Sequence, residues 1–235
     1  MMASRARSFL IAIATAVTLV ASATESLAIP VTVPTSLSPG AQYRLAFVTS
    51  TTRDASSSNI ADYNAFVTGV ANAVSQLSAL GATWTAIGST NAVAARDNTS
   101  TNPGVDGTGV PIFLLDDTLL ATGNADLWDG SITNPLRIDQ TGTLVVGGGS
   151  ASFVWTGSNV SGTQAGFNLN LGNGTPFHGN ITSTSSGWIA ANNLSSLNSF
   201  HLYAISSTLT VIPEPGTAAL LALGLIALGV ARRNV

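Results

Sequence analysis

Apolar residues recur at intervals of three and four between residues 60 and 80, which is the clearest periodic pattern in the 235-residue chain. Such steps place apolar side chains on one side of an α-helix, and Gly81 is a typical residue after a helix end. The pattern predicts one amphipathic helix over 60–80, preceded by serines that can cap it. Its apolar side is expected to pack on a sheet. The residues on that side are Ile60, Tyr63, Val67, Val70, Val74, Leu77 and Leu80.

The rest of the central chain shows short strand patterns. Over 43–49, larger apolar residues alternate with Arg44 and Ala46, which predicts a strand with one buried side. The continuous apolar run over 110–116 predicts a buried strand that starts at a proline. Residues 91–109 are expected to form a loop. Further short strands are expected at 84–87, 144–146, 153–156, 167–171 and 200–212.

These elements together predict an α+β fold. One early helix would pack on short, loop-rich and mainly antiparallel strands, because the helix and each strand must bury one apolar side. The length from residue 29 to residue 212 suits a single domain with its own core. Both ends of the chain look different from this central part.

Residues 1–28 have the order of a secretory signal peptide. Two arginines precede an apolar run over 9–21, and Ser26 and Ala28 are small residues at the third and first positions before a cut. We therefore predict export by the Sec machinery and cleavage after Ala28, with 21–23 as a second cleavage position. An uncleaved membrane anchor is the alternative, but the run is short of the ~20 residues that span a bilayer.

Residues 213–235 combine three features in order. Pro213, Glu214 and Pro215 favour an extended segment, because proline disfavours helix both at its own position and before it. An apolar run over 216–231 follows, just long enough for a short membrane helix at ~1.5 Å per residue. Arg232 and Arg233 then hold the far end on the cytoplasmic side.

This tail closely resembles the PEP-CTERM sorting domain of biofilm-forming Gram-negative bacteria. The resemblance implies recognition by an exosortase, a membrane cysteine protease-transpeptidase, with cleavage near the Pro-Glu-Pro motif. It also implies transient anchoring in the inner membrane, then transfer to the cell surface or release. A simple tail anchor after a proline-rich stop is the alternative, disfavoured because the signal peptide and the tail occur together.

The composition narrows the function of the domain over 29–212. Only 8% of all residues are charged, against ~25% in ordinary soluble proteins. This domain holds four arginines and nine aspartates, so its net charge is 4 − 9 = −5. Without a basic stripe, nucleic-acid binding is disfavoured. Without any cysteine, disulfides and thiolate catalysis are excluded.

Four aspartates form the densest acidic cluster and are weak candidates for a calcium site: Asp116, Asp117, Asp126 and Asp129. Ca²⁺ takes several oxygen ligands, and extracellular modules often supply them from loops. The spacing does not match an EF-hand, however, and Asp-Gly turns explain the aspartates with no metal. The turn interpretation is favoured, and no cofactor is predicted.

Trp128 and Trp155 share a Trp-x-Gly-Ser pattern. Exposed tryptophans would offer flat apolar faces on which sugars stack, which makes these two residues candidates for glycan contact. Burial in the core is the simpler interpretation in a domain without disulfides. Both alternatives stay open at the level of sequence.

The central domain also resembles a C-type-lectin-like domain in the order of its elements. The resemblance depends on Gly81 with Trp84 and on the segments 113–117, 127–130, 154–157 and 202–205. It implies a lectin-like fold. The chain lacks the cysteines common in that family, and it lacks the Glu-Pro-Asn or Gln-Pro-Asp and Trp-Asn-Asp signatures of calcium-dependent sugar binding.

Catalytic motifs are not evident. There is no Gly-x-Ser-x-Gly, no lysine for a phosphate loop, and His178 and His201 lie far from other ligand types in sequence. We therefore predict a non-enzymatic surface or matrix protein in contact with exopolysaccharide. The alternative is an exported hydrolase in which an aspartate converges with one of the two histidines.

Overall fold

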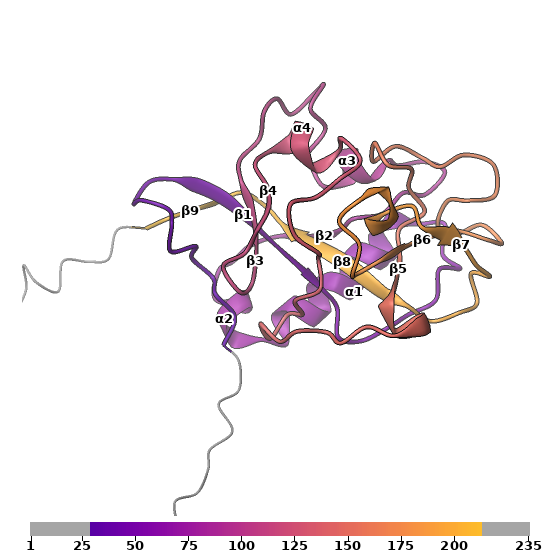
Figure 1. Cartoon of the computed structure of the whole chain (residues 1–235), viewed down its shortest axis with the longest axis horizontal. Helices are drawn as coiled ribbons and strands as arrows, with labels where there is room; N and C mark the ends of the chain where they lie inside the picture. The colour runs from indigo at the N-terminus through magenta and orange to yellow at the C-terminus, as the bar shows by residue number, and fades with distance from the viewer. Residues whose placement is uncertain (1–28, 213–235) are drawn as a thin grey trace, which may run out of the picture.

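The computed structural model describes residues 29–212. The predicted cleavage residue Ala28, the Pro213, Glu214 and Pro215 motif, the apolar run 216–231, and Arg232 with Arg233 lie outside this range. Within it, no helix is long and apolar enough to cross a membrane. The elements, shown in Figure 1, are β1 Gln42–Val48, α1 Ile60–Asn72, α2 Ser75–Ser78, β2 Trp84–Ala86, α3 Ala95–Asn98, β3 Ile112–Leu114, β4 Leu119–Ala121, α4 Asn124–Leu127, η1 Gly149–Ser152, β5 Phe153–Trp155, β6 Phe177–Asn180, η2 Ser186–Trp188, β7 Asn192–Asn193, β8 His201–Ser206 and β9 Leu209–Thr210.

One mixed sheet organises the described residues. Its main order is β4-β3-β1-β8-β5-β6-β7, with β2 paired to β8 and β9 paired to β1. The β1–β3 and β5–β8 pairs are parallel, and the other pairs are antiparallel. A mixed sheet with few helices agrees with the α+β prediction. Along the long axis of the molecule, β9 and the β6–β7 pair lie at opposite ends (Figure 1).

Strand β1 is buried on both sides, not on one as predicted. It lies between β3 and β8, so the side that carries Arg44 and Ala46 is covered as well. Arg44 donates hydrogen bonds to the carbonyl oxygens of Thr99 (2.7 Å), Ser100 (2.9 Å) and Ser206 (3.0 Å). Burial lowers the pKa of the Arg44 guanidinium. The three carbonyls offset the cost of removing this charge from water.

The single helix predicted over 60–80 is wrong in its second half. Helix α1 ends at Asn72, Val74 is extended (φ −104°, ψ 117°), and the short α2 begins at Ser75. Asn, Val and Ser are weak helix formers, so this stretch breaks at little cost. Leu77 in α2 is fully buried all the same.

The first half of the helix behaves as predicted. Asn59, rather than one of the preceding serines, caps α1 by accepting a bond from the backbone N–H of Ala61 (3.1 Å). The apolar side that includes Tyr63 and Val67 is buried, and α1 packs against β2 and β8. The predicted packing of this helix on a sheet is therefore confirmed.

Five of the seven predicted strand segments form strands. The predicted strands over 43–49, 84–87, 110–116 and 153–156 correspond to β1, β2, β3 and β5, and the stretch 200–212 forms β8 and β9. The expected loop over 91–109 contains the short helix α3. Strands β4, β6 and β7 were not predicted, because two to four residues show no readable alternation.

Two predicted strands do not exist. At 144–146 there is only an isolated bridge, from Ile138 to Leu144, and Val146 is exposed. At 167–171 the chain turns, because Phe167 adopts a left-handed conformation (φ 49°). Both stretches contain apolar residues that the fold leaves in water, so their hydrophobicity misled the prediction.

The core is continuous and rich in aromatic residues. Trp84, Trp155 and Trp188 are fully buried. The Trp84 ring meets Phe47 of β1 edge-on at 5.0 Å between centroids, and the Trp155 ring lies 4.6 Å from that of Phe200. Each such ring removes a large apolar area from water, which stabilises a domain that has no disulfide.

Candidate functional site

The two tryptophans proposed for glycan contact are core residues. Trp128 is 6% exposed and Trp155 is 0% exposed. The Nε1 atom of Trp128 donates to the Thr101 hydroxyl at 2.9 Å, and that of Trp155 donates to the carbonyl oxygen of Asn198 at 3.2 Å. A sugar cannot stack on rings that the core already covers. The prediction that Trp128 and Trp155 contact glycan is therefore wrong, and the core interpretation holds.

The four candidate calcium ligands bind backbone and hydroxyl groups. In the described part of the chain, no group of three or more His, Cys, Asp or Glu side chains could hold a metal ion. For Asp116, Asp126 and Asp129 the partners lie two to four residues away, which is the turn chemistry that the sequence suggested, whereas Asp117 binds Thr35, 82 residues away in sequence. The carboxylate partners are the Thr118 N–H for Asp116, the Thr35 N–H and hydroxyl for Asp117, the Thr122 N–H and hydroxyl for Asp126, and the Ser131 N–H and hydroxyl for Asp129.

The two histidines are buried and bind backbone carbonyls. His201 Nδ1 lies 2.6 Å from the carbonyl oxygen of Thr49, and His178 Nδ1 lies 3.2 Å from that of Gly179. Because a carbonyl only accepts, these contacts place the ring proton on Nδ1. Burial lowers the pKa of His178, which favours its neutral form. Within residues 29–212, neither ring is hydrogen-bonded to an aspartate or a hydroxyl.

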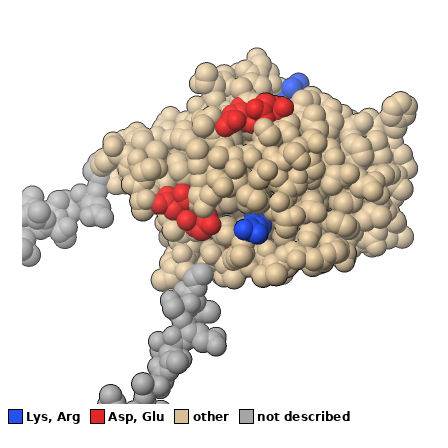
Figure 2. Space-filling model, viewed as in Figure 1, with Lys and Arg blue, Asp and Glu red and all other residues tan. Residues whose placement is uncertain are grey.

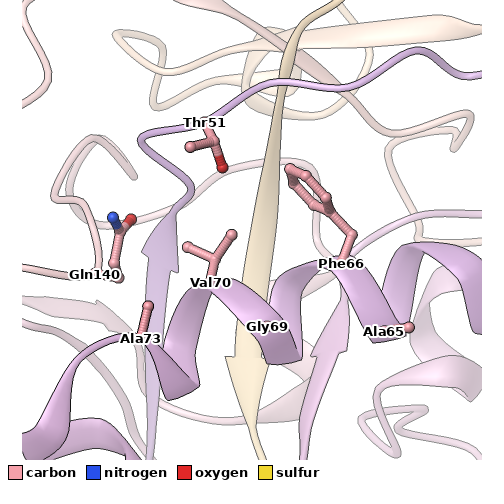
Figure 3. A pocket seen from close by; sticks show the side chains of 7 residues that line it. All are labelled: Thr51, Ala65, Phe66, Gly69, Val70, Ala73 and Gln140. Atoms are coloured by element: carbon pink, nitrogen blue, oxygen red, sulfur yellow. The ribbon is translucent and has the colours of Figure 1, made fainter.

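A groove of about 420 Å³ runs over the outer side of α1 (Figure 3). Phe66 and Val70 supply its apolar wall, and the remaining lining side chains are small or neutral. Since the lining holds no acid, base or nucleophile pair, it offers no catalytic arrangement. The lining residues are Thr51, Ala65, Phe66, Gly69, Val70, Ala73 and Gln140.

A second cavity, of about 190 Å³, lies beside Arg44. Its polar lining includes Asn98 and Ser207. The guanidinium that borders it already donates to three backbone carbonyls, so its charge serves the fold. Neither hollow gathers the groups that the hydrolase alternative requires.

The carboxy-terminal part of the domain has no charged residue. Between Asp139 and Glu214 the sequence contains no Asp, Glu, Lys or Arg. On the face shown in Figure 2, charged atoms form a few small clusters, and the end that carries β6 and β7 in Figure 1 is uncharged. This part of the surface can interact with a ligand through hydroxyl, amide and apolar groups only.

An asparagine cluster lies at this uncharged part of the molecule. The side-chain amides of Asn91 and Asn173 bind each other reciprocally, with N···O distances of 3.1 and 3.0 Å. Asn170 is buried and donates to Asn91 Oδ1 at 2.7 Å. The cluster joins two loops that are about eighty residues apart in sequence.

Phe167 is at the tip of the second of these loops. Its side chain is fully exposed and its backbone is left-handed. The Asn173 amide donates to its carbonyl oxygen at 3.4 Å. Sequence reasoning missed this residue by placing it in a strand. The flanking Gly166 and Asn168 were the available signal, since both residue types favour turns.

Comparison with known families identifies the carboxy-terminal segment. A family model described as a PEP-CTERM protein-sorting motif matches residues 211–233. The chain therefore carries this motif, which confirms the resemblance of its tail and implies an exported protein that an exosortase sorts toward the cell envelope or surface. Val211, the first matched residue, still belongs to the domain, because its N–H donates to the carbonyl of Ala41 at 2.9 Å. None of the curated proteins compared with the chain matches it.

Proposed function

We propose that the mature protein is a non-enzymatic component of the cell surface or extracellular matrix that contacts exopolysaccharide. The observation that carries the proposal is that one chain combines a sorting motif at 211–233 with a domain in which residues 140–212 contain no charged side chain. A neutral surface of hydroxyls and amides exchanges hydrogen bonds with sugar hydroxyls at small desolvation cost. The apolar run over 216–231 serves as the transient membrane anchor before cleavage.

The position of the sorting motif supports this arrangement. Strand β9 leads directly into the motif, whereas β6 and β7 lie at the far end of the long axis (Figure 1). A domain held through its carboxy terminus can therefore direct its uncharged end away from the attachment point. The lectin-like resemblance remains a prediction, and the proposal does not depend on it.

The hydrolase alternative is less well supported. It requires an aspartate near His178 or His201, and both rings are instead bonded to backbone carbonyls. The calcium alternative needs several carboxylates around one point, and the four candidate aspartates are each engaged with a different hydrogen-bond partner.

Sorting is tested in the producing cells with Glu214→Gln. If an exosortase reads this glutamate, the variant should keep its tail and accumulate in the membrane fraction, where mass spectrometry of its carboxy terminus detects residues beyond 215. Asp129→Asn makes the same acid-to-amide change inside the domain and should mature normally. Normal processing of Glu214→Gln would contradict the role of the motif residue.

Glycan contact is tested with the mature protein released from cells. It should sediment with exopolysaccharide purified from the same cells, and the bound fraction should not fall when salt rises to ~1 M, because screening weakens only interactions between charges. If none sediments, the protein has a structural role without polysaccharide contact.

A further inference from the structure

We propose that Phe167 and the asparagine amides around it form a binding site for a neutral saccharide, with the phenyl ring as a stacking platform. This inference rests on the proposed function, because it names the site and the ligand class for the polysaccharide contact. It replaces Trp128 and Trp155, whose rings are buried.

Two unfavourable features coincide at Phe167. The benzyl group is fully exposed, so the chain forgoes the ~1.5–3 kcal/mol that burying a phenylalanine contributes. Its φ of 49° is left-handed, which costs a residue with a Cβ about 1–2 kcal/mol. Folding alone would favour glycine or asparagine here. A site that binds a ligand through the ring explains both features.

Hydrogen bonds at the base of the loop fix the backbone on both sides of Phe167. Buried Asn170 accepts a bond from the Gly166 N–H at 3.2 Å and donates to Asn91. Leu169 accepts from the Phe177 N–H at 2.8 Å, which ties the loop to the start of β6, and the N–H of buried Leu171 donates to the carbonyl of Ser89 at 2.9 Å. A loop fixed on both sides of its tip loses little entropy on binding.

Polar groups that suit sugar hydroxyls surround the tip. The exposed Asn168 and the Asn91–Asn173 pair flank the loop. An amide has two N–H donors and two acceptor lone pairs. After the bonds within the cluster, Asn91 keeps one N–H and Asn173 keeps one lone pair on Oδ1, so the pair together can donate to one sugar hydroxyl and accept from another. A pyranose ring presents C–H groups on its faces and hydroxyls on its rim, which matches an aromatic plane bordered by amides.

The charge pattern restricts the ligand class. Phe167 carries no charge, and neither do the residues whose hydrogen bonds fix its loop: Ser89, Asn91, Asn170, Asn173 and Phe177. Without a cation, the site cannot attract an anionic polysaccharide. A neutral polysaccharide binds there without the cost of removing water from a charged group. The ligand class is therefore a neutral, hydroxyl-rich polysaccharide.

The test compares Phe167→Ala with Leu197→Ala in the mature protein. Leu197 is also highly exposed but lies in another loop, so it controls for loss of surface hydrophobicity. The probes are dextran, amorphous cellulose and galactomannan as neutral glycans, and alginate as an anionic one. Phe167→Ala should bind the retained neutral glycan about tenfold more weakly, the size expected for one aromatic contact. Leu197→Ala should bind as wild type.

Two further variants and a salt series make the test decisive. Phe167→Trp keeps a stacking face and should preserve binding, whereas Phe167→Gly removes it, relieves the left-handed strain and should keep the urea midpoint at or above that of wild type. Wild-type binding of neutral glycan that is unchanged in Phe167→Ala would overturn this site and leave the proposed function standing. If wild type binds no glycan, or binds only alginate and loses it in ~0.5 M salt, the neutral-saccharide site is overturned; complete absence of binding also refutes the proposed glycan contact.

Discussion

The two parts of the domain differ in charge and share one sheet. Residues 29–139 hold all four arginines and all nine aspartates of the domain, and residues 140–212 hold none. Every helix labelled α in the described residues lies in the first part. Yet β8 of the second part pairs with β1 and β2 of the first, so the two parts form one folded unit. Charge is thus dispensable for building half of this sheet.

Two similar turns, one with Asp139 at the boundary between the parts and one with Asn159 in the second part, show why. In the sequence Asp139-Gln-Thr-Gly-Thr143, the carboxylate Oδ1 accepts from the N–H groups of Thr141 (2.8 Å) and Thr143 (3.0 Å). In Asn159-Val-Ser-Gly-Thr163, the amide Oδ1 accepts from Ser161 (3.0 Å) and Thr163 (3.1 Å). The turn requires an oxygen acceptor at that position, and an amide supplies it without a charge.

Charges in the first part mostly satisfy backbone groups. Arg53 lies over the ring of Tyr63, 4.3 Å from its centroid, and donates to the carbonyl of Asp62 at 2.8 Å. Arg44 likewise binds three carbonyls. In the second part, asparagine, serine and threonine perform such tasks. The difference concerns the surface presented to other molecules more than the stability of the fold.

The largest expected effect is the difference in stability loss between alanine substitutions in the two Trp-x-Gly-Ser segments, one of which lies in each part. Gly157 has φ 56°, and a Cβ there would lie 2.5 Å from the carbonyl oxygen of Ser89 and clash with the backbone of Leu171. Gly130 is also left-handed, but its Cβ would meet only Val160 at 3.9 Å. Gly157→Ala should therefore lower the free energy of unfolding by at least about 3 kcal/mol, from strain and overpacking together.

Gly130→Ala is the matched control and should cost about 1–2 kcal/mol, from backbone strain alone. Urea unfolding followed by tryptophan fluorescence measures both variants. Equal losses would mean that the two segments are packed alike, which would contradict the difference between the parts.

An effect of intermediate size is expected in the pH dependence of the free energy of unfolding. Burial among Phe153, Trp155 and Phe200 lowers the pKa of His178 below its usual 6.5. The unfolded chain therefore takes up a proton at His178 more readily than the native state does. The contribution of His178 to the free energy of unfolding is fully present above pH ~6.5 and is lost as the pH falls toward the folded pKa. The slope is at most ~1.4 kcal/mol per pH unit for one proton.

The measurement is urea unfolding at pH 7.5, 6.0 and 5.0. His178→Phe removes the titrating group and keeps an aromatic ring, so its loss of stability between pH 7.5 and 5.0 should be smaller than that of wild type. Identical pH dependence in both proteins would show that the uncharged part owes nothing of its acid sensitivity to this residue.

The smallest expected effect comes from replacing the side chain of Asp139, whose Oδ1 is the acceptor in the turn over 139–143. Asp139→Asn converts the first turn into the chemistry of the second and should change the free energy of unfolding by less than about 0.5–1 kcal/mol, since Oδ1 keeps its acceptor role. Asp139→Ala removes the acceptor and should cost about 1–3 kcal/mol. A large loss in Asp139→Asn would mean that this turn, unlike the one at Asn159, needs a charged acceptor.

Much of the framework was predictable from local pattern. The strand around Phe47 was found from its alternation and the strand around Phe113 from its continuous apolar run. The start of α1 was found because a 3.6-residue period extends over several turns. The break at Val74 was not found, because the apolar period continues through it while the backbone does not. Strand β7, only two asparagines long, has no sequence signal at all.

The candidate site could not be predicted in the same way. Trp155 and Phe167 are both aromatic and both lie among glycine, serine and asparagine in the sequence, yet one is buried and the other is fully exposed. What separates them is contact with distant segments, such as the Phe200 ring over Trp155 and the Asn91 amide beneath the Phe167 loop. Such contacts are not encoded in any short window.

The sequence by itself determined where this protein is sent, because Pro213, Glu214 and Pro215 with the apolar run and arginines form a linear signal read over 211–233. It also determined the neutrality of residues 140–212, which is a matter of composition. Only the tertiary structure decided which aromatic ring meets solvent. Exposure is a property of packing between residues far apart in the chain, and it placed Phe167 outside and Trp128 and Trp155 inside.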